Sequence, residues 1–204
     1  MRNGIAAALI FACSAIAGPA SAEVAASGET GFVIRQAADV EASPEAAWDQ
    51  LVKPSAWWNG KHSYSGDAAN LTIDPRAGGC FCEVLPSPTS PRAAPRGSVE
   101  HMRVIYVERP RVLRMSGALG PLQSEGAQGT LTIALRPIEG GGTRIMWEYV
   151  VGGYIRQKPD QMAPMVDAVL GEQLRRLAAE LGPKAASRPP AQPQNTPQSP
   201  GEGR

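Results

Sequence analysis

Two cysteines, Cys80 and Cys82, stand one residue apart and are the first candidates for chemistry in this sequence. Alternate residues of a strand have Cα atoms about 6.6 Å apart, whereas a disulfide brings the Cβ atoms to about 3.8 Å, so a bridge requires a bulge or a kink. A structural zinc ion needs about two further ligands, and the only histidines, His62 and His101, do not stand at zinc-finger spacing. We therefore expect two free thiols packed in a strand, with a disulfide or a metal site as the alternatives.

Glu83, Glu100 and His101 have the side chains for acid–base chemistry. In a regular strand Glu83 faces away from the two cysteines, and a lone glutamate is expected to be a solvated charge on the outer face unless it lies inside a cavity. Glu100 and His101 face opposite sides of their strand. In a regular strand three apolar residues would lie on the same face as His101 and favour an inward histidine: Val99, Ile105 and Val107. An inward His101 is either a hydrogen-bonded core residue or an acid–base group acting with Glu83 or Glu100.

Aromatic and methionine side chains are the candidates for a ligand-binding wall. The adjacent Trp57 and Trp58 lie in an irregular segment that could cover a cavity mouth, and Trp147 and Tyr149 share one face of a strand. Methionines at the start of the last helix would adapt to varied ligand shapes. Core packing is the alternative explanation for the aromatic residues. The predicted ligand-binding set is Trp57, Trp58, His101, Trp147, Tyr149, Met162 and Met165, around an apolar pocket with few polar groups.

Hydrophobic periodicity predicts the elements that position these residues. Alternation predicts a strand over 32–42, and Ser43 as N-cap before Pro44 predicts a short helix over 43–52. Apolar residues at helical spacing predict a long amphipathic helix over 159–182. The remaining strands are expected at 71–73, 79–85, 98–108, 111–116, 129–137 and 143–151. Strands with helices segregated from them indicate an α+β fold.

The two ends of the chain are expected to lie outside the folded domain. Residues 1–22 contain Arg2, a short apolar run and a small-x-small site, the layout of a signal peptide cleaved after Ala22. The mature chain is then periplasmic or secreted, and lipid attachment at Cys13 is the alternative. The expected organisation is a signal peptide over 1–22, a linker over 23–30, a domain over 31–182 and a disordered proline-rich tail over 183–204.

Charge and motif content exclude several classes of function. The chain has 20 basic and 19 acidic residues, and no cluster of lysine and arginine marks a nucleic-acid-binding surface. After the N-terminal segment, no apolar run approaches the roughly 20 residues that cross a membrane. The sequence has no nucleophile elbow, phosphate loop, dinucleotide fingerprint or zinc-protease motif. We therefore predict no cofactor, no metal and no nucleic-acid partner, and the oligomeric state stays open.

Five stretches resemble the helix-grip superfamily that includes START domains, polyketide cyclases and Hsp-activator-like proteins, the SRPBCC proteins. They are 57-WWNGKHSYSGDAANLTID-74, 78-GGCFCE-83, 117-GALGPLQSEGAQGTLTIAL-135, 143-TRIMWEYVVGGY-154 and 166-VDAVLGEQLRRL-177. The first two are similar to an exported, uncharacterised bacterial subgroup. The resemblance implies a curved antiparallel sheet of about six to seven strands around a long C-terminal helix, with a cavity between them.

Three functions fit these features. The first is an exported protein that binds a small hydrophobic molecule without changing it. The second is an enzyme of the cyclase, dehydrase or hydrolase kind that uses His101 with Glu83 or Glu100 in a desolvated cavity. The third is an interaction module of the cell envelope that uses the proline-rich tail as a tether.

Overall fold

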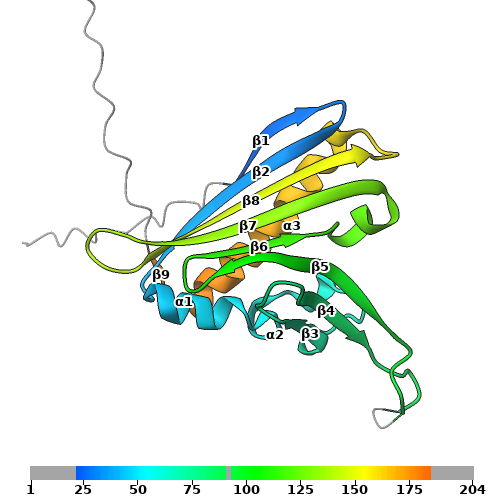
Figure 1. Ribbon diagram of the computed structural model, residues 1–204, viewed down its shortest axis with the longest axis horizontal. Helices are drawn as coiled ribbons and strands as arrows, with labels where there is room; N and C mark the ends of the chain where they lie inside the picture. The colour runs from blue at the N-terminus through cyan, green and yellow to red at the C-terminus, as the bar shows by residue number, and fades with distance from the viewer. Residues whose placement is uncertain (1–21, 91–92, 185–204) are drawn as a thin grey trace, which may run out of the picture.

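Nine β-strands form one antiparallel sheet in the computed structural model, which describes residues 22–90 and 93–184. The order is β1-β2-β8-β7-β6-β5-β4-β3, and β9 pairs with the far end of β2. The sheet is open and curved, and the long helix α3 lies across one face (Figure 1). The strands are β1 (Ala22–Gly28), β2 (Gly31–Val40), β3 (Leu71–Ile73), β4 (Cys80–Leu85), β5 (Gly97–Glu108), β6 (Val112–Ser116), β7 (Gly126–Pro137), β8 (Thr143–Tyr154) and β9 (Pro183–Lys184).

The α+β class is confirmed, and the number of strands exceeds the six to seven expected. The expected linker over 23–30 is wrong, because most of it forms β1 along the edge of β2. The expected tail begins too early, since Pro183 and Lys184 form β9 beside Val40 and Asp39. Small and polar residues give these strands no alternating pattern, and they are held by backbone hydrogen bonds that an open sheet edge offers to any chain. Residues 185–204 lie outside the described part of the chain, as do residues 1–21.

The central strands follow their hydrophobic alternation. Along β8, Ile145, Trp147, Tyr149 and Val151 are buried and their neighbours are more exposed. The β7 residues on the same face, from Leu131 to Leu135, are buried in the same alternating way. A strand places alternate side chains on opposite faces, so this pattern directs one apolar face toward the helix.

Helix α3 (Pro159–Glu180) covers this face and packs closely on β1 and β2. Its buried residues recur at helical spacing, from Met162 through Leu170 to Leu177. Gly182 follows with φ +75°, a left-handed conformation that glycine adopts without strain and that ends the helix. Within the described residues, no helix is long and apolar enough to cross a membrane.

Two short helices close one end of the domain. In α1 (Pro44–Leu51) the Ser43 side chain accepts a hydrogen bond from the Ala46 amide, which confirms the predicted N-cap. The segment expected to be irregular contains α2 (Pro54–Trp57) and two 3₁₀ turns, Gly60–His62 and Ala68–Asn70. A third 3₁₀ turn, Gly120–Ser124, follows β6.

The Tyr149 side chain is fully buried against Gly129 of the neighbouring strand β7, and this contact predicts the effect of substituting that glycine. A Cβ at Gly129 would lie 2.6 Å from Tyr149 Cζ. The ring cannot move aside easily, because the hydroxyl accepts from the Leu119 amide at 3.1 Å and donates to the Gly117 carbonyl at 3.2 Å. We expect Gly129→Ala to lower the free energy of unfolding by about 1–3 kcal/mol through overpacking, as measured by urea titration.

Gly97→Ala is the matched control, since its Cβ would meet only a Leu85 methyl carbon at 3.6 Å, an ordinary contact. Its unfolding free energy should stay near that of the wild type. Equal stability losses in the two variants would contradict the role assigned to the fixed Tyr149 ring.

Candidate functional site

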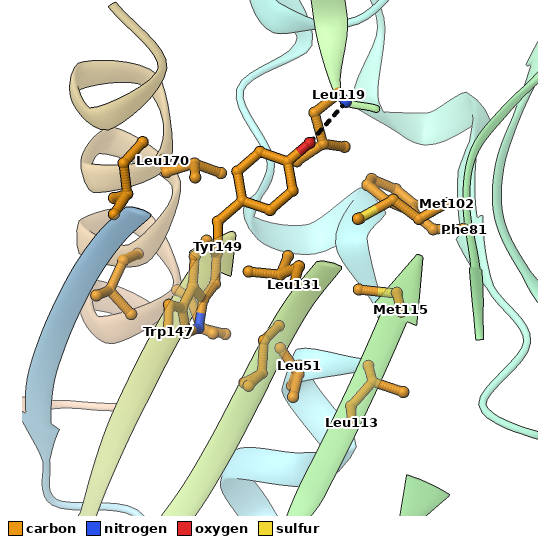
Figure 2. Close-up of a cluster of buried hydrophobic side chains, with 14 of the residues drawn as sticks. Leu51, Phe81, Met102, Leu113, Met115, Leu119, Leu131, Trp147, Tyr149 and Leu170 are labelled. Carbon is orange, nitrogen blue, oxygen red and sulfur yellow. Dashed lines mark hydrogen bonds between the residues drawn. The ribbon is translucent and has the colours of Figure 1, made fainter. Parts of the chain in front are cut away.

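A cavity of about 420 Å³ lies beside the N-terminal half of α3. The rest of its wall comes from residues 58–64, from His101 of β5 and from the segment that follows β6. Its lining is mainly apolar, and the residues are Trp58, Lys61, His62, Ser63, Tyr64, His101, Leu119, Gly120, Pro121, Met162, Met165, Val166, Val169 and Leu170. Figure 2 shows Leu170 and Leu119 on either side of the Tyr149 ring in the buried cluster.

Glu83 and His101 form a buried polar pair at the cavity wall. His101 Nε2 lies 3.0 Å from a Glu83 carboxylate oxygen, and the exposed fractions of the two side chains are 6% and 0%. The carboxylate also accepts hydrogen bonds from the backbone amides of Tyr64 and Ser65. These amides supply the partners that a buried carboxylate needs when it has lost its water.

The two groups titrate below their ordinary ranges. Burial lowers the pKa of His101 by more than the neighbouring Glu83 carboxylate raises it. Burial would raise the pKa of Glu83, but the hydrogen bonds from Ser65, Tyr64 and His101 outweigh it and hold that pKa below its usual value. At neutral pH the pair is therefore a carboxylate beside a neutral imidazole.

A β-bulge aims His101 at this site. Phe81 of β4 pairs with Met102 of β5 while Cys82 pairs with Glu100, so His101 is an extra residue in β5. His101 and Met102 are consequently both buried although they are consecutive. The inward histidine agrees with the expectation. The reason given for it, regular alternation along the whole strand, is wrong.

A second irregularity, opposite β6, also breaks the regular alternation of β5. It falls between Val104 and Tyr106 and leaves Ile105 49% exposed, although a regular strand would place Ile105 on the same face as His101. Glu100 is also on the outer surface and pairs with Arg103. Glu100 is therefore not the partner of His101.

The expectation of a solvated Glu83 is wrong. Phe81 and Glu83 occupy the buried face of β4, and the two cysteines occupy the opposite, half-buried face. The alternation was predicted correctly, but the polar residue points inward and the small apolar ones point outward. A sequence gives no sign of this exchange, because the amides that stabilise Glu83 come from Tyr64 and Ser65, about twenty positions away.

Two free thiols were expected at positions 80 and 82, and this is also wrong, because Cys80 and Cys82 form a disulfide. Their Cα atoms are 5.4 Å apart, closer than the roughly 6.6 Å of a regular strand. The irregular pairing of β4 with β5 lies between Phe81 and Cys82, so the distortion that such a bridge requires is present.

The segment of residues 57–65, which covers one side of the cavity, is fastened at both ends. Arg176 of α3 donates to the Trp57 carbonyl, and Gln173 accepts from the Asn59 amide. At the other end Glu83 holds the two backbone amides, and the Tyr64 hydroxyl donates to the Gly120 carbonyl at 3.1 Å. This wall of the cavity is thus tied to α3, to β4 and to the segment after β6.

The predicted ligand-binding residues divide into two groups. Trp58, His101, Met162 and Met165 line the cavity. Trp57, Trp147 and Tyr149 do not line it and are core residues, with the rings of Trp57 and Trp147 in edge contact at 6.0 Å. Figure 2 shows Trp147 and Tyr149 among leucine and methionine side chains of the core.

Several lining residues were not predicted as ligand contacts. Val166 and Val169 belong to the same helical stripe as Met162, so the period of the helix contained their signal. Tyr64, Leu119 and their loop neighbours had no such periodicity. Their position depends on long-range hydrogen bonds that one sequence does not reveal.

The side chains of this site can form hydrogen bonds with a bound molecule, and His101 can accept a proton from it. Across residues 22–90 and 93–184, no three His, Cys, Asp or Glu side chains lie close enough to hold a metal ion. The absence of a metal or cofactor stays a prediction.

Solved structures share the fold. No family model matches the sequence, and no curated protein is significantly similar to it. A conserved protein of unknown function from Enterococcus faecalis, EF2215, superposes with a TM-score of 0.51 at 13% identity, over 86% of this chain and 82% of its own. The Mll3558 protein of Rhizobium loti gives a TM-score of 0.50 at 19% identity, over 73% of this chain and 96% of its own. At these identities the likeness shows the fold alone.

Acid should destabilise the domain through the Glu83–His101 pair. Because the folded pKa of each group lies below its unfolded value, the unfolded chain binds protons first as the pH falls, and stability falls with it. The loss begins near the ordinary histidine value of 6.5 and is extended by Glu83 near 4.5. We expect urea titrations to show that the free energy of unfolding declines from about pH 7 to about pH 5. The decline should be shallower in His101→Phe. Parallel pH profiles for the two proteins would contradict this assignment.

Proposed function

We propose that this protein binds one small, largely apolar molecule in the cavity beside α3. The observation that carries the proposal is an apolar cavity of about 420 Å³ with a buried histidine in its wall. Ligand sites are commonly concave and apolar with a few placed polar groups, and their volumes run from about 300 to 1,000 Å³. Flexible Met162 and Met165 at the start of α3 suit a ligand that must enter and leave.

The finer family assignment is part of the proposal. An antiparallel sheet followed by a long C-terminal helix, with a cavity beside that helix, supports a helix-grip protein of the SRPBCC and START-like superfamily. The five sequence stretches that resemble this superfamily include Trp58, Glu83, Leu119 and Val166, which lie at or beside the cavity. A shared fold does not name a ligand, so the function rests on the cavity.

Export is proposed on two grounds. The N-terminal segment has the layout of a signal peptide cleaved after Ala22, which predicts a periplasmic or secreted protein. The Cys80–Cys82 disulfide adds support, because disulfides persist mainly in oxidising compartments.

Filling the cavity should abolish binding without unfolding the protein. Val169 is a half-buried cavity residue, and Val150 is an exposed valine on the opposite face of the sheet. We expect native mass spectrometry of protein recovered from the exported fraction to show a dissociable small-molecule adduct in the wild type and in Val150→Trp. The adduct should be lost in Val169→Trp, because the indole occupies the ligand volume.

The same spectra test the disulfide, whose closure removes the mass of two hydrogen atoms.

Two small apolar probes, 4-propylphenol and 4-propylanisole, can be added to the wild-type protein. A wild-type protein that carries no adduct and takes up neither probe would overturn the binding proposal.

Catalysis on the bound molecule is the second candidate, and the Glu83–His101 pair favours it. A neutral imidazole oriented by a buried carboxylate is a competent general base, and such groups contribute about 10²–10⁴-fold to a rate. Purified protein can be assayed with 4-nitrophenyl butyrate, a neutral apolar ester. His101→Ala should lower kcat/KM by at least about 100-fold, whereas Glu100→Gln, on the outer surface, should not.

The pH dependence of this turnover has a fixed sign. The base is the unprotonated imidazole, so the rate should rise with pH through the lowered pKa of His101 and then level off. Turnover that survives in His101→Ala would remove the catalytic assignment and leave the binding proposal untouched.

A further inference from the structure

The hydrogen bonds of Glu83 fix the position of the proton on His101. One carboxylate oxygen accepts from the Tyr64 amide and faces His101 Nε2, and the other accepts from the Ser65 amide. Two amide donors converge on this group, so it is satisfied as an ionised carboxylate that only accepts hydrogen bonds. The histidine must then donate through Nε2, because two acceptors cannot bond to each other.

His101 Nδ1 is consequently an acceptor with an open position. In the neutral imidazole one nitrogen donates and the other accepts. Nδ1 forms no hydrogen bond with any residue of 22–90 or 93–184, and it is not among the sealed polar atoms that lack a partner in those ranges. His101 is one of the residues that line the cavity, and 6% of its side-chain surface remains exposed.

The other polar side chains of the inner wall are already engaged. Ser63 Oγ donates to the Gly60 carbonyl and accepts from the Gly66 amide. The Tyr64 hydroxyl donates to Gly120, and the Trp58 ring nitrogen donates to the His62 carbonyl. Lys61 and His62 belong to the exposed rim, and His62 pairs there with Glu172. Among these described groups, His101 Nδ1 is the polar side-chain atom of the inner wall that has no hydrogen-bond partner, and the side-chain donors are all engaged.

Building on the proposed ligand site, we infer that the natural ligand is a neutral apolar molecule carrying a hydrogen-bond donor, such as a phenol or an alcohol, whose hydroxyl donates to His101 Nδ1. A ligand without this donor would leave Nδ1 dry and unpaired, which is unfavourable in an apolar cavity. A carboxylate would direct its lone pairs at the lone pair of Nδ1. The site therefore selects by hydrogen-bond polarity as well as by shape.

Matched probes test this inference. The dissociation constants of 4-propylphenol and 4-propylanisole are measured by calorimetry for wild type, His101→Phe and Ile105→Phe. The two probes differ in the donor hydroxyl, and Ile105→Phe adds the same side chain to the exposed side of β5. We expect the anisole-to-phenol ratio of Kd to be about three- to tenfold larger in wild type and Ile105→Phe than in His101→Phe, since one hydrogen bond contributes about 0.5–1.5 kcal/mol net.

The outcomes separate this inference from the proposed function. If both probes bind and the ratio is the same in all three proteins, the donor inference fails and the cavity proposal stands. Tighter binding of 4-propylbenzoate than of the phenol would also overturn it. If no probe binds and the wild type carries no adduct, the cavity proposal fails and the inference fails with it.

The tautomer can be read in the wild-type protein, so the test does not depend on the folding of a variant. The chain has only two histidines, which makes assignment of their ring nitrogens by ¹⁵N-detected NMR direct. We expect the His101 proton on Nε2, with Nδ1 unprotonated and shifted by added 4-propylphenol. A proton on Nδ1 at neutral pH would overturn the inference.

Discussion

The Glu83 carboxylate is the interaction on which the candidate site depends. It joins three parts of the chain that are far apart in sequence: its own strand β4, the bulged strand β5 through His101, and the segment after α2 through Tyr64 and Ser65. Its side chain has no exposed surface, so each of these hydrogen bonds replaces one that water would have made. Removing any one partner leaves a charge incompletely compensated, which couples the order of the covering segment to the orientation of the histidine.

Local distortion of two strands makes this arrangement possible. The bulge opposite Phe81 turns His101 inward beside Met102, and the disulfide of the flanking cysteines closes on the other face of β4. Phe81, between the cysteines, packs its ring on His101 at 4.9 Å and on Trp58 at 5.3 Å. The two bridged cysteines therefore flank Phe81, whose ring contacts two residues of the cavity wall. A regular β4–β5 ladder would not place Phe81, Glu83, His101 and Met102 all on the inner face.

Much of the fold was predictable, because its largest elements obey single periodicities. The alternation of Ile145 to Val151 and the helical stripe from Met162 to Leu177 each specify an element and its buried face. Strand β1 could not be found in this way, since small and polar residues make its pairing depend on the backbone alone. The site was predictable only in part. Met162 follows from the helical stripe of α3. The inward position of His101 depends on a bulge, and strict alternation along β5 fails there and again at Ile105. Glu83 is satisfied by amides that lie distant in sequence.

Stability does not account for a Glu–His pair at this position. A buried polar pair commonly stabilises a fold no better than well-packed apolar side chains of similar volume, because desolvation offsets most of the attraction. The surroundings of His101 are Phe81, Tyr64 and an apolar cavity, where an aromatic residue would pack well. What the pair supplies, and apolar side chains cannot, is an oriented hydrogen-bond acceptor in a mainly apolar wall. The arrangement is therefore the physical reason to test the proposed recognition of a small molecule, or chemistry on it, at His101 first.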